Sequence, residues 1–178
     1  MNKVILVNEK DQSVGEMEKL EAHQRGLLHR AFSVFVFNDK NELLLQKRAL
    51  SKYHSGGLWT NTCCSHPEPN ESNLNAAKRR LKEEMNYTCE LKEGFSFIYK
   101  IDFENGLSEH ELDHVIIGAA NEDPILNPEE ASDFKWLSIE EIETQIETNK
   151  NEFTYWFVLI LTKYKNELLQ SISKNINK

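Results

Sequence analysis

Two glutamates flank a histidine at positions 109–111, within the sequence Ser-Glu-His-Glu-Leu-Asp-His. If this segment is a strand, Glu109 and Glu111 point to one face and His110 points to the other, because side chains alternate along a strand. Two carboxylates on one face repel each other unless a cation or a shared proton relieves the repulsion. The apolar run 115–118 follows at once, which places the pair beside a core strand. The spacing therefore indicates a site for a hard metal ion or for acid–base catalysis.

Three histidines, His23, His29 and His66, are the natural completion of such a site. Imidazoles mixed with carboxylates suit zinc or manganese by ligand type, and magnesium stays open. A histidine taken alone is more often a surface or core side chain with an ordinary hydrogen-bond partner. Cys64 lies two residues before His66, and its thiol can act as an acid or a base only when its surroundings tune its pKa. The alternative for Cys64 is a buried structural thiol.

Composition limits the class of protein. The chain has 178 residues, 39% of them hydrophobic, which predicts one folded domain spanning 1–178. The formal net charge of −8 argues against nucleic acid or an anionic membrane as a partner, so an anionic substrate would need a local basic pocket. Three cysteines, two of them adjacent, form no disulfide framework and fit a reducing cytoplasm. No segment approaches the ~20 apolar residues that span a bilayer, and no heptad pattern indicates an interface. We expect a cytoplasmic monomer.

Apolar alternation and turn residues predict strands and helices in mixed order. The predicted strands are 4–7, 32–37, 43–47, 95–101, 115–120 and 134–137, with the second and third joined as a hairpin through 38–41. Helices are predicted over 72–85 after the N-cap Ser72, from the capping box that Ser138 opens, and over 154–173. Residues 51–69 lack a regular pattern. The predicted fold class is mixed α/β (α+β), a β-sheet sandwich flanked by helices in a single compact domain.

Residues 65–87 resemble a Nudix box, the pattern G-x5-E-x7-R-E-U-x-E-E-x-G-U in which U is a bulky apolar residue. Glu71 and Arg79 stand at the spacing of the box, and Glu83 and Glu84 form its acidic end. A helix that lines up glutamates in this way holds divalent cations that bridge a diphosphate. The resemblance implies a Nudix-like fold.

Three positions depart from that box. Ser65 replaces its first glycine, Arg80 replaces a metal-binding glutamate, and Asn86 replaces its last glycine. A cation at Arg80 is expected to cripple hydrolysis and to suit the binding of a diphosphate without its cleavage. The alternative for this stretch, taken by itself, is a charged and solvated helix face.

Further motifs resemble the type I isopentenyl-diphosphate Δ-isomerase family, which has the Nudix fold. They are L-H-R-A-F-S at 28–33, R-A-L-S-K at 48–52, T-N-T-C-C-S-H-P at 60–67, E-H-E at 109–111 and F-T-Y-W at 153–156. These motifs follow the family's order at compatible spacings from about Val4 to the C-terminal helix. The resemblance implies an isomerase of isoprenoid biosynthesis that interconverts isopentenyl diphosphate and dimethylallyl diphosphate.

The resemblance also implies two metal sites. One divalent metal, Mn²⁺, Zn²⁺ or Mg²⁺, would be bound by three histidines and two glutamates: His23, His29, His66, Glu109 and Glu111. Glu84 would hold a second ion, Mg²⁺, that contacts the substrate diphosphate. His54, His110 and His114 match no ligand position, so they are expected to be ordinary side chains.

The same resemblance assigns the residues that act on the substrate. Cys64 and Glu111 would be an acid–base pair on opposite faces of the substrate, and which of them delivers the proton stays open. Trp156 would stabilise a tertiary carbocation through its electron-rich face. Tyr99 would hydrogen-bond to the catalytic glutamate and assist protonation. Four basic residues would bind the diphosphate: Arg48, Lys52, Arg80 and Lys19.

Two other functions remain open on the sequence. A Nudix hydrolase that cleaves a nucleotide diphosphate is one, and Arg80 argues against it. A non-catalytic module that binds a metal or a ligand is the other, and it leaves Cys64 and Trp156 without a role. Whether the first fifteen or so residues become ordered only when substrate and metal bind is also open.

Overall fold

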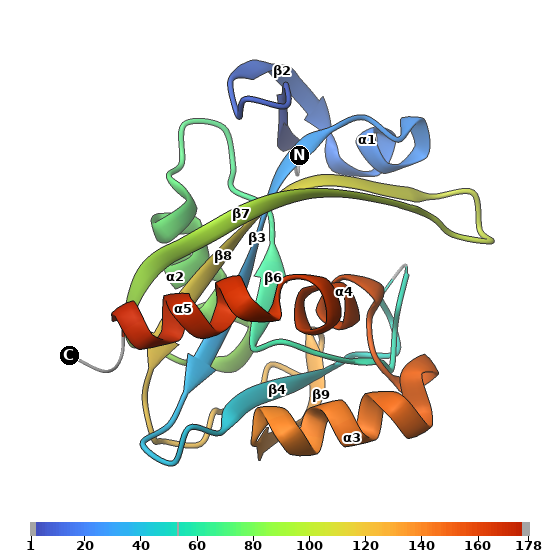
Figure 1. Ribbon diagram of the computed structural model, residues 1–178. Coiled ribbons are helices and arrows are strands. Elements are labelled where there is room, and N and C mark those ends of the chain that lie inside the picture. The colour runs from blue at the N-terminus through green and yellow to red at the C-terminus, as the bar shows by residue number, and fades with distance from the viewer. Residues whose placement is uncertain (1–2, 53, 176–178) are drawn as a thin grey trace.

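The computed structural model describes residues 3–52 and 54–175, and Figure 1 shows them as a twisted sheet with helices on both faces. Its strands are β1 (Lys3–Val7), β2 (Ser13–Glu18), β3 (His29–Phe37), β4 (Leu43–Arg48), β5 (Trp59–Thr60), β6 (Cys63–Ser65), β7 (Glu90–Asp102), β8 (Ser108–Ala119) and β9 (Ala131–Leu137). Its helices are α1 (Lys19–Arg25), α2 (Asn73–Met85), α3 (Ile139–Asn149), the 3-10 helix η1 (Lys150–Glu152), α4 (Tyr155–Lys163) and α5 (Lys165–Asn175). No helix in these ranges is long and apolar enough to cross a membrane.

Strand β3 is the centre of the sheet. It runs parallel to β8, with His29 opposite Glu111, and β7 continues that side as the antiparallel partner of β8. On its other side β3 pairs with the short strand β6, where Ser33 lies opposite Cys64. The hairpin of β1 and β2 joins the beginning of β3, and a second group of strands, β9, β4 and β5, meets its end at Phe37.

The side chains of β3 alternate between two cores. Val34 and Val36 pack with the apolar face of α2, whereas Phe35 and Phe37 pack with α3, α4 and α5. This alternation follows from the period of two in a strand. Ser33 therefore shares the face that the C-terminal helices cover, which is the face on which the site described below is built.

The predicted helix starts are confirmed. Ser72 caps α2 by accepting a hydrogen bond from the Asn75 backbone N–H, and Ser138 with Glu141 forms both halves of a capping box at α3. Asn86, which stands where the Nudix box has its last glycine, ends α2 with φ at 47°. Asparagine is among the residues that adopt this left-handed conformation most readily, so the substitution keeps the helix end.

Two predictions of secondary structure are wrong, and a third is right only in part. The predicted connection of β3 to β4 through 38–41 is present, but the two strands pair only at Phe37 and Leu43, and β4 otherwise pairs with β5 and β9. The stretch 51–69 contains the strands β5 and β6, and the single C-terminal helix is two helices that separate at Tyr164. The predicted strand 4–7 is β1, and β2 and α1 follow it in a stretch for which no element was predicted. The strand partners were missed because long-range pairing decides them.

Candidate active site

The predicted alternation of residues 109–111 is confirmed on β8. Glu109 and Glu111 are both buried on the face toward the C-terminal helices. His110 points away, and its Nδ1 lies 3.0 Å from the backbone oxygen of Gly26. The two carboxylates are therefore separated from the histidine between them, as the strand geometry requires.

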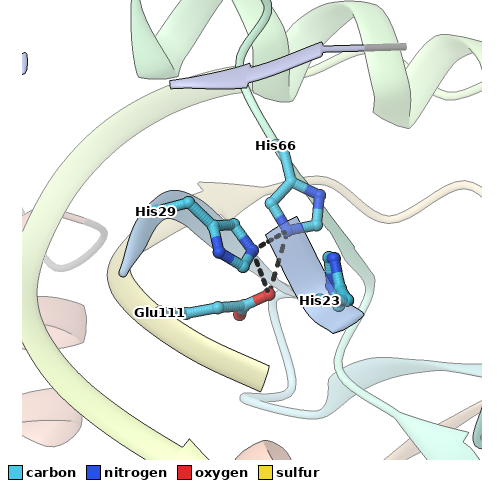
Figure 2. A group of neighbouring side chains, drawn as sticks. All are labelled: His23, His29, His66 and Glu111. Atoms are coloured by element: carbon cyan, nitrogen blue, oxygen red, sulfur yellow. Dashed lines mark hydrogen bonds and ion pairs between the residues drawn. The ribbon is translucent and has the colours of Figure 1, made fainter. Parts of the chain in front are cut away.

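Three histidines from separate elements converge on Glu111, as Figure 2 shows. His23 comes from α1, His29 opens β3, and His66 follows β6. The Oε1 atom of Glu111 lies 2.9 Å from Nε2 of His66 and 3.5 Å from Nε2 of His29, and the two imidazole nitrogens are 3.2 Å apart. One potential ligand atom from each of the four residues lies within 4.8 Å of every other.

The surroundings of these rings suit a metal ligand. Nδ1 of His23 lies 2.7 Å from the backbone oxygen of Lys19, and Nδ1 of His29 lies 2.8 Å from that of Leu27. A carbonyl oxygen only accepts, so each Nδ1 carries the proton and each Nε2 keeps its lone pair toward the cluster. Burial lowers the pKa of His23 and of His66, which keeps both rings in the neutral form that binds metals. The donor set fits a divalent cation.

Tyr99 connects the two glutamates. It lies opposite Glu111 in the pairing of β7 with β8, and its hydroxyl donates to Oε2 of Glu111 at 2.7 Å and lies 3.0 Å from Oε2 of Glu109. Burial and the charge of Glu111 raise the pKa of Glu109. Burial acts against the ionised form of Glu111 as well, but the interactions of its carboxylate with the imidazoles of His66 and His29 outweigh burial and lower the pKa of Glu111. Of the two carboxylates, Glu111 is therefore the one whose ionised form its surroundings favour.

His54 is a site residue that the sequence analysis did not find. Its Nε2 lies 3.2 Å from Oε1 of Glu109, and its ring stacks on Phe103 and meets the edge of Trp156. Burial lowers the pKa of His54 to about 3, so the ring is neutral. Glu109 thus belongs with His54 and His23 in a second group of potential ligands, beside the four residues that include Glu111. Only the position of His54 two residues after Lys52 could have signalled this.

A pocket opens over this cluster. Its walls combine ten of the predicted residues, namely Cys64, His66, Glu109, Glu111, Tyr99, Trp156, Arg48, Lys52, Arg80 and Lys19. Ser33 and His54 also line the pocket, whereas Glu84 and the fully buried His23 and His29 do not.

Cys64 is a protonated thiol at neutral pH. Burial raises its pKa to about 12, and the nearby charge of Arg48 opposes that effect without cancelling it. Nη1 of Arg48 lies 3.8 Å from the sulfur, and the same guanidinium sits 5.3 Å from the ring centroid of Trp156. Cys63 alternates to the opposite face and is buried in the core beneath α2, where it packs as a structural thiol.

Glu84 lies apart from the histidines. Its buried carboxylate accepts from Nη2 of Arg80 at 2.8 Å and from Nε2 of Gln46 at 2.9 Å. Arg80, at the position of a Nudix-box glutamate, therefore neutralises the glutamate one helical turn later. Glu71 and Arg79 keep the box geometry, with two hydrogen bonds of 2.9 and 2.7 Å.

Comparison with known proteins decides the family. Residues 27–157 match the NUDIX domain. The chain is 51% identical to isopentenyl-diphosphate Delta-isomerase 2 of Aromatoleum aromaticum, over 91% of this chain and 86% of that protein. It is 49% identical to the isopentenyl-diphosphate Delta-isomerase of Pectobacterium atrosepticum, over 92% and 91%. The chain belongs to the type I isopentenyl-diphosphate Δ-isomerase family.

The fold agrees with this family's place in the Nudix superfamily. The solved structure of a MutT protein from Methanosarcina mazei superposes with a TM-score of 0.65 over 79% of this chain and 95% of that one, at 18% identity. On α2 of this chain, Arg80 forms ion pairs with Glu83 and Glu84. These ion pairs agree with the effect expected of Arg80, because a guanidinium stands where the Nudix box has a further metal-binding carboxylate.

Proposed function

We propose that this pocket carries out the isomerisation of isopentenyl diphosphate to dimethylallyl diphosphate and its reversal. The observation that carries the proposal is the presence of Cys64 and Glu111 on the walls of one pocket, on the two strands that flank β3. Each residue is a titratable group, and their strands approach the pocket from different sides. A double-bond shift needs a proton added at one carbon and another removed from a neighbouring carbon.

The two protons are handled by two groups. Protonation of the terminal carbon of the double bond gives a tertiary carbocation, and loss of a proton from the carbon beside the diphosphate-bearing carbon gives dimethylallyl diphosphate. Cys64 and Glu111 carry out these steps, with the hydroxyl of Tyr99 bonded to Glu111. The ring of Trp156, buried at the pocket wall, faces the cation and stabilises it without trapping it as a nucleophile would.

The diphosphate is bound by Arg48, Lys52 and Arg80, with Lys19 as a further cation on the wall of the same pocket. These cations supply the local positive charge that an acidic chain needs for an anionic substrate. Burial lowers the pKa of Lys19, and the charge of Glu111 opposes that effect.

Two divalent ions complete the proposed site. Mn²⁺, Zn²⁺ or Mg²⁺ would be held by His23, His29, His66, Glu109 and Glu111, and Mg²⁺ by Glu84 together with the diphosphate. When bound, the first ion would neutralise buried carboxylates and orient Glu111. For Glu109 to join that set, its carboxylate has to leave His54, which it contacts at 3.2 Å.

Heavy water tests the reaction directly. Isopentenyl diphosphate incubated with the metal-loaded protein in deuterium oxide should yield dimethylallyl diphosphate that carries deuterium, read by NMR and mass spectrometry. Absence of both product and label with folded, metal-loaded protein would refute the proposal. Phosphate release from nucleoside diphosphate derivatives would instead favour the hydrolase.

We further propose a cytoplasmic monomer. The three cysteines are unpaired, which agrees with a reducing compartment. Light scattering coupled to size-exclusion chromatography should give the mass of one 20.7 kDa chain. A mass of twice that value would contradict the monomer.

A further inference from the structure

Glu130 joins two of the cations that the proposed function assigns to the diphosphate. Its Oε2 atom forms an ion pair with Nζ of Lys52 and lies 3.1 Å from Nη2 of Arg80. The three side chains are each only about one fifth exposed, at 21%, 21% and 20%, so the contacts are partly shielded from water. One carboxylate oxygen therefore holds a lysine from one loop and an arginine from α2 side by side.

The backbone fixes where this carboxylate stands. Glu130 is the last residue before β9, and its carbonyl oxygen accepts from the Ala49 backbone N–H at 2.9 Å. The Asn127 backbone N–H donates to the backbone oxygen of Glu84 at 2.9 Å, and the Asn127 side-chain amide donates to the backbone oxygen of Glu83 at 3.3 Å. The loop between β8 and β9 is thus attached both to the chain after β4 and to the end of α2.

Lys52 depends on this contact more than Arg80 does. Arg80 also donates to Glu83 at 2.7 Å and to Glu84 at 2.8 Å, so three carboxylates hold its guanidinium. Within the described chain, no carboxylate other than Glu130 lies within ion-pair distance of Lys52. A lysine side chain has a flexible four-carbon stem, and two neighbouring cations repel each other unless an anion lies between them.

We propose that Glu130 is a positioning residue for the substrate diphosphate. It keeps Lys52 beside Arg80, so that two cations stand ready for two linked phosphate groups. The diphosphate, with more negative charge than a carboxylate, binds both cations from the pocket over the histidine cluster, which Lys52 and Arg80 line and Glu130 does not. The inference rests on the proposed binding of the diphosphate by these two residues.

Glu130→Gln tests this role, with Glu129→Gln as the matched control. Both changes remove one negative charge, and the two residues are adjacent in the chain. Both line one cavity, which Lys52 and Arg80 also line. We expect Glu130→Gln to raise KM for isopentenyl diphosphate by ~10-fold or more and to change kcat by less than ~3-fold, because a substrate contact and not the proton transfer is disturbed. Glu129→Gln should change neither constant. Glu130→Asp keeps the negative charge, so its KM should lie between those of wild type and Glu130→Gln.

Calorimetric binding of inorganic diphosphate with Mg²⁺ separates the inference from the function. Wild type should bind, Lys52→Ala should bind weakly, and Glu130→Gln should bind at least ~10-fold more weakly than wild type. An unchanged or tighter Kd in Glu130→Gln would overturn the positioning role, the tighter value because the carboxylate would then compete with the ligand. No binding by wild type would instead refute the diphosphate site itself. If Glu130→Gln does not fold, Glu130→Asp carries the same test, with a smaller loss expected and an unchanged Kd as the refuting result.

Discussion

The hydroxyl of Tyr99 lies 2.7 Å from Oε2 of Glu111, directly across the β7–β8 pair. The other oxygen of Glu111 lies 2.9 Å from Nε2 of His66. One carboxylate thus connects a phenol on one side to the histidine cluster on the other. Its two oxygens have separate partners, so the effect of replacing Tyr99 and the effect of replacing His66 can be measured separately.

Tyr99→Phe should lower kcat by ~10- to 100-fold and leave KM and bound metal nearly unchanged. The change removes one hydrogen bond to an ionised carboxylate, which is worth about 1.5–3 kcal/mol, while the ring still packs between Phe97 and Tyr155. Steady-state kinetics on metal-loaded protein and metal analysis of the same sample give both quantities. Loss of metal together with activity would show that Tyr99 supports ligand binding rather than proton transfer.

Cys64→Ala should reduce turnover by ~100-fold or more, because a positioned acid or base contributes ~10²–10⁴ to a rate. Cys89→Ala is the control, since Cys89 is a thiol outside the pocket with a pKa raised to about 11 by burial. Label exchange in deuterium oxide measures both variants. Activity near that of wild type in Cys64→Ala would exclude the thiol from the chemistry.

His66→Gln should weaken the binding of one divalent metal by at least ~10-fold, whereas His110→Gln should leave that affinity unchanged. The alternation of β8 directs His110 toward Gly26 and away from the cluster, whereas His66 contacts Glu111. Competition with a chromogenic chelator measures both affinities. Equal loss in the two variants would contradict the proposed ligand set.

Asp113→Asn should make stability less dependent on pH. Burial and the charge of Glu111 raise the pKa of Asp113 in the folded chain to about 8, from an ordinary value of 3.8. The folded chain therefore keeps a proton that the unfolded chain releases. The resulting stability is complete below about pH 4 and is lost as the pH rises through about 8.

The Asp113→Asn side chain can still accept from the hydroxyl of Ser33, which donates to Asp113 at 2.8 Å. The free energy of unfolding of the variant relative to wild type should thus rise by about 1–3 kcal/mol between about pH 5.5 and about pH 8.5. Urea unfolding of the metal-free proteins, followed by circular dichroism, measures the difference. Parallel pH curves would show that Asp113 is ionised in the folded chain.

Local patterns were sufficient for part of this site. The alternation of a strand separates Glu109 and Glu111 from His110 in any fold that keeps the segment extended, so three letters of sequence predicted which side chains share a face. Helix caps are local as well, and Ser72 and Ser138 were predicted for that reason. Resemblance to a family supplied the remaining roles, since residues far apart in the chain carry no local sign that they meet.

The tertiary structure decided which strands pair and which distant side chains meet. Strand β3 takes β8 as its main partner and leaves β4 after one residue pair, because burial of both faces of β3 outweighs the short connection at 38–41. His54 and Glu130 came to light only in three dimensions, where one meets Glu109 and the other joins Lys52 to Arg80. The sequence by itself determined the chemical groups and the face of each strand that carries them. The folded chain decided which groups meet, because contacts between distant segments depend on the packing of the whole sheet and its helices.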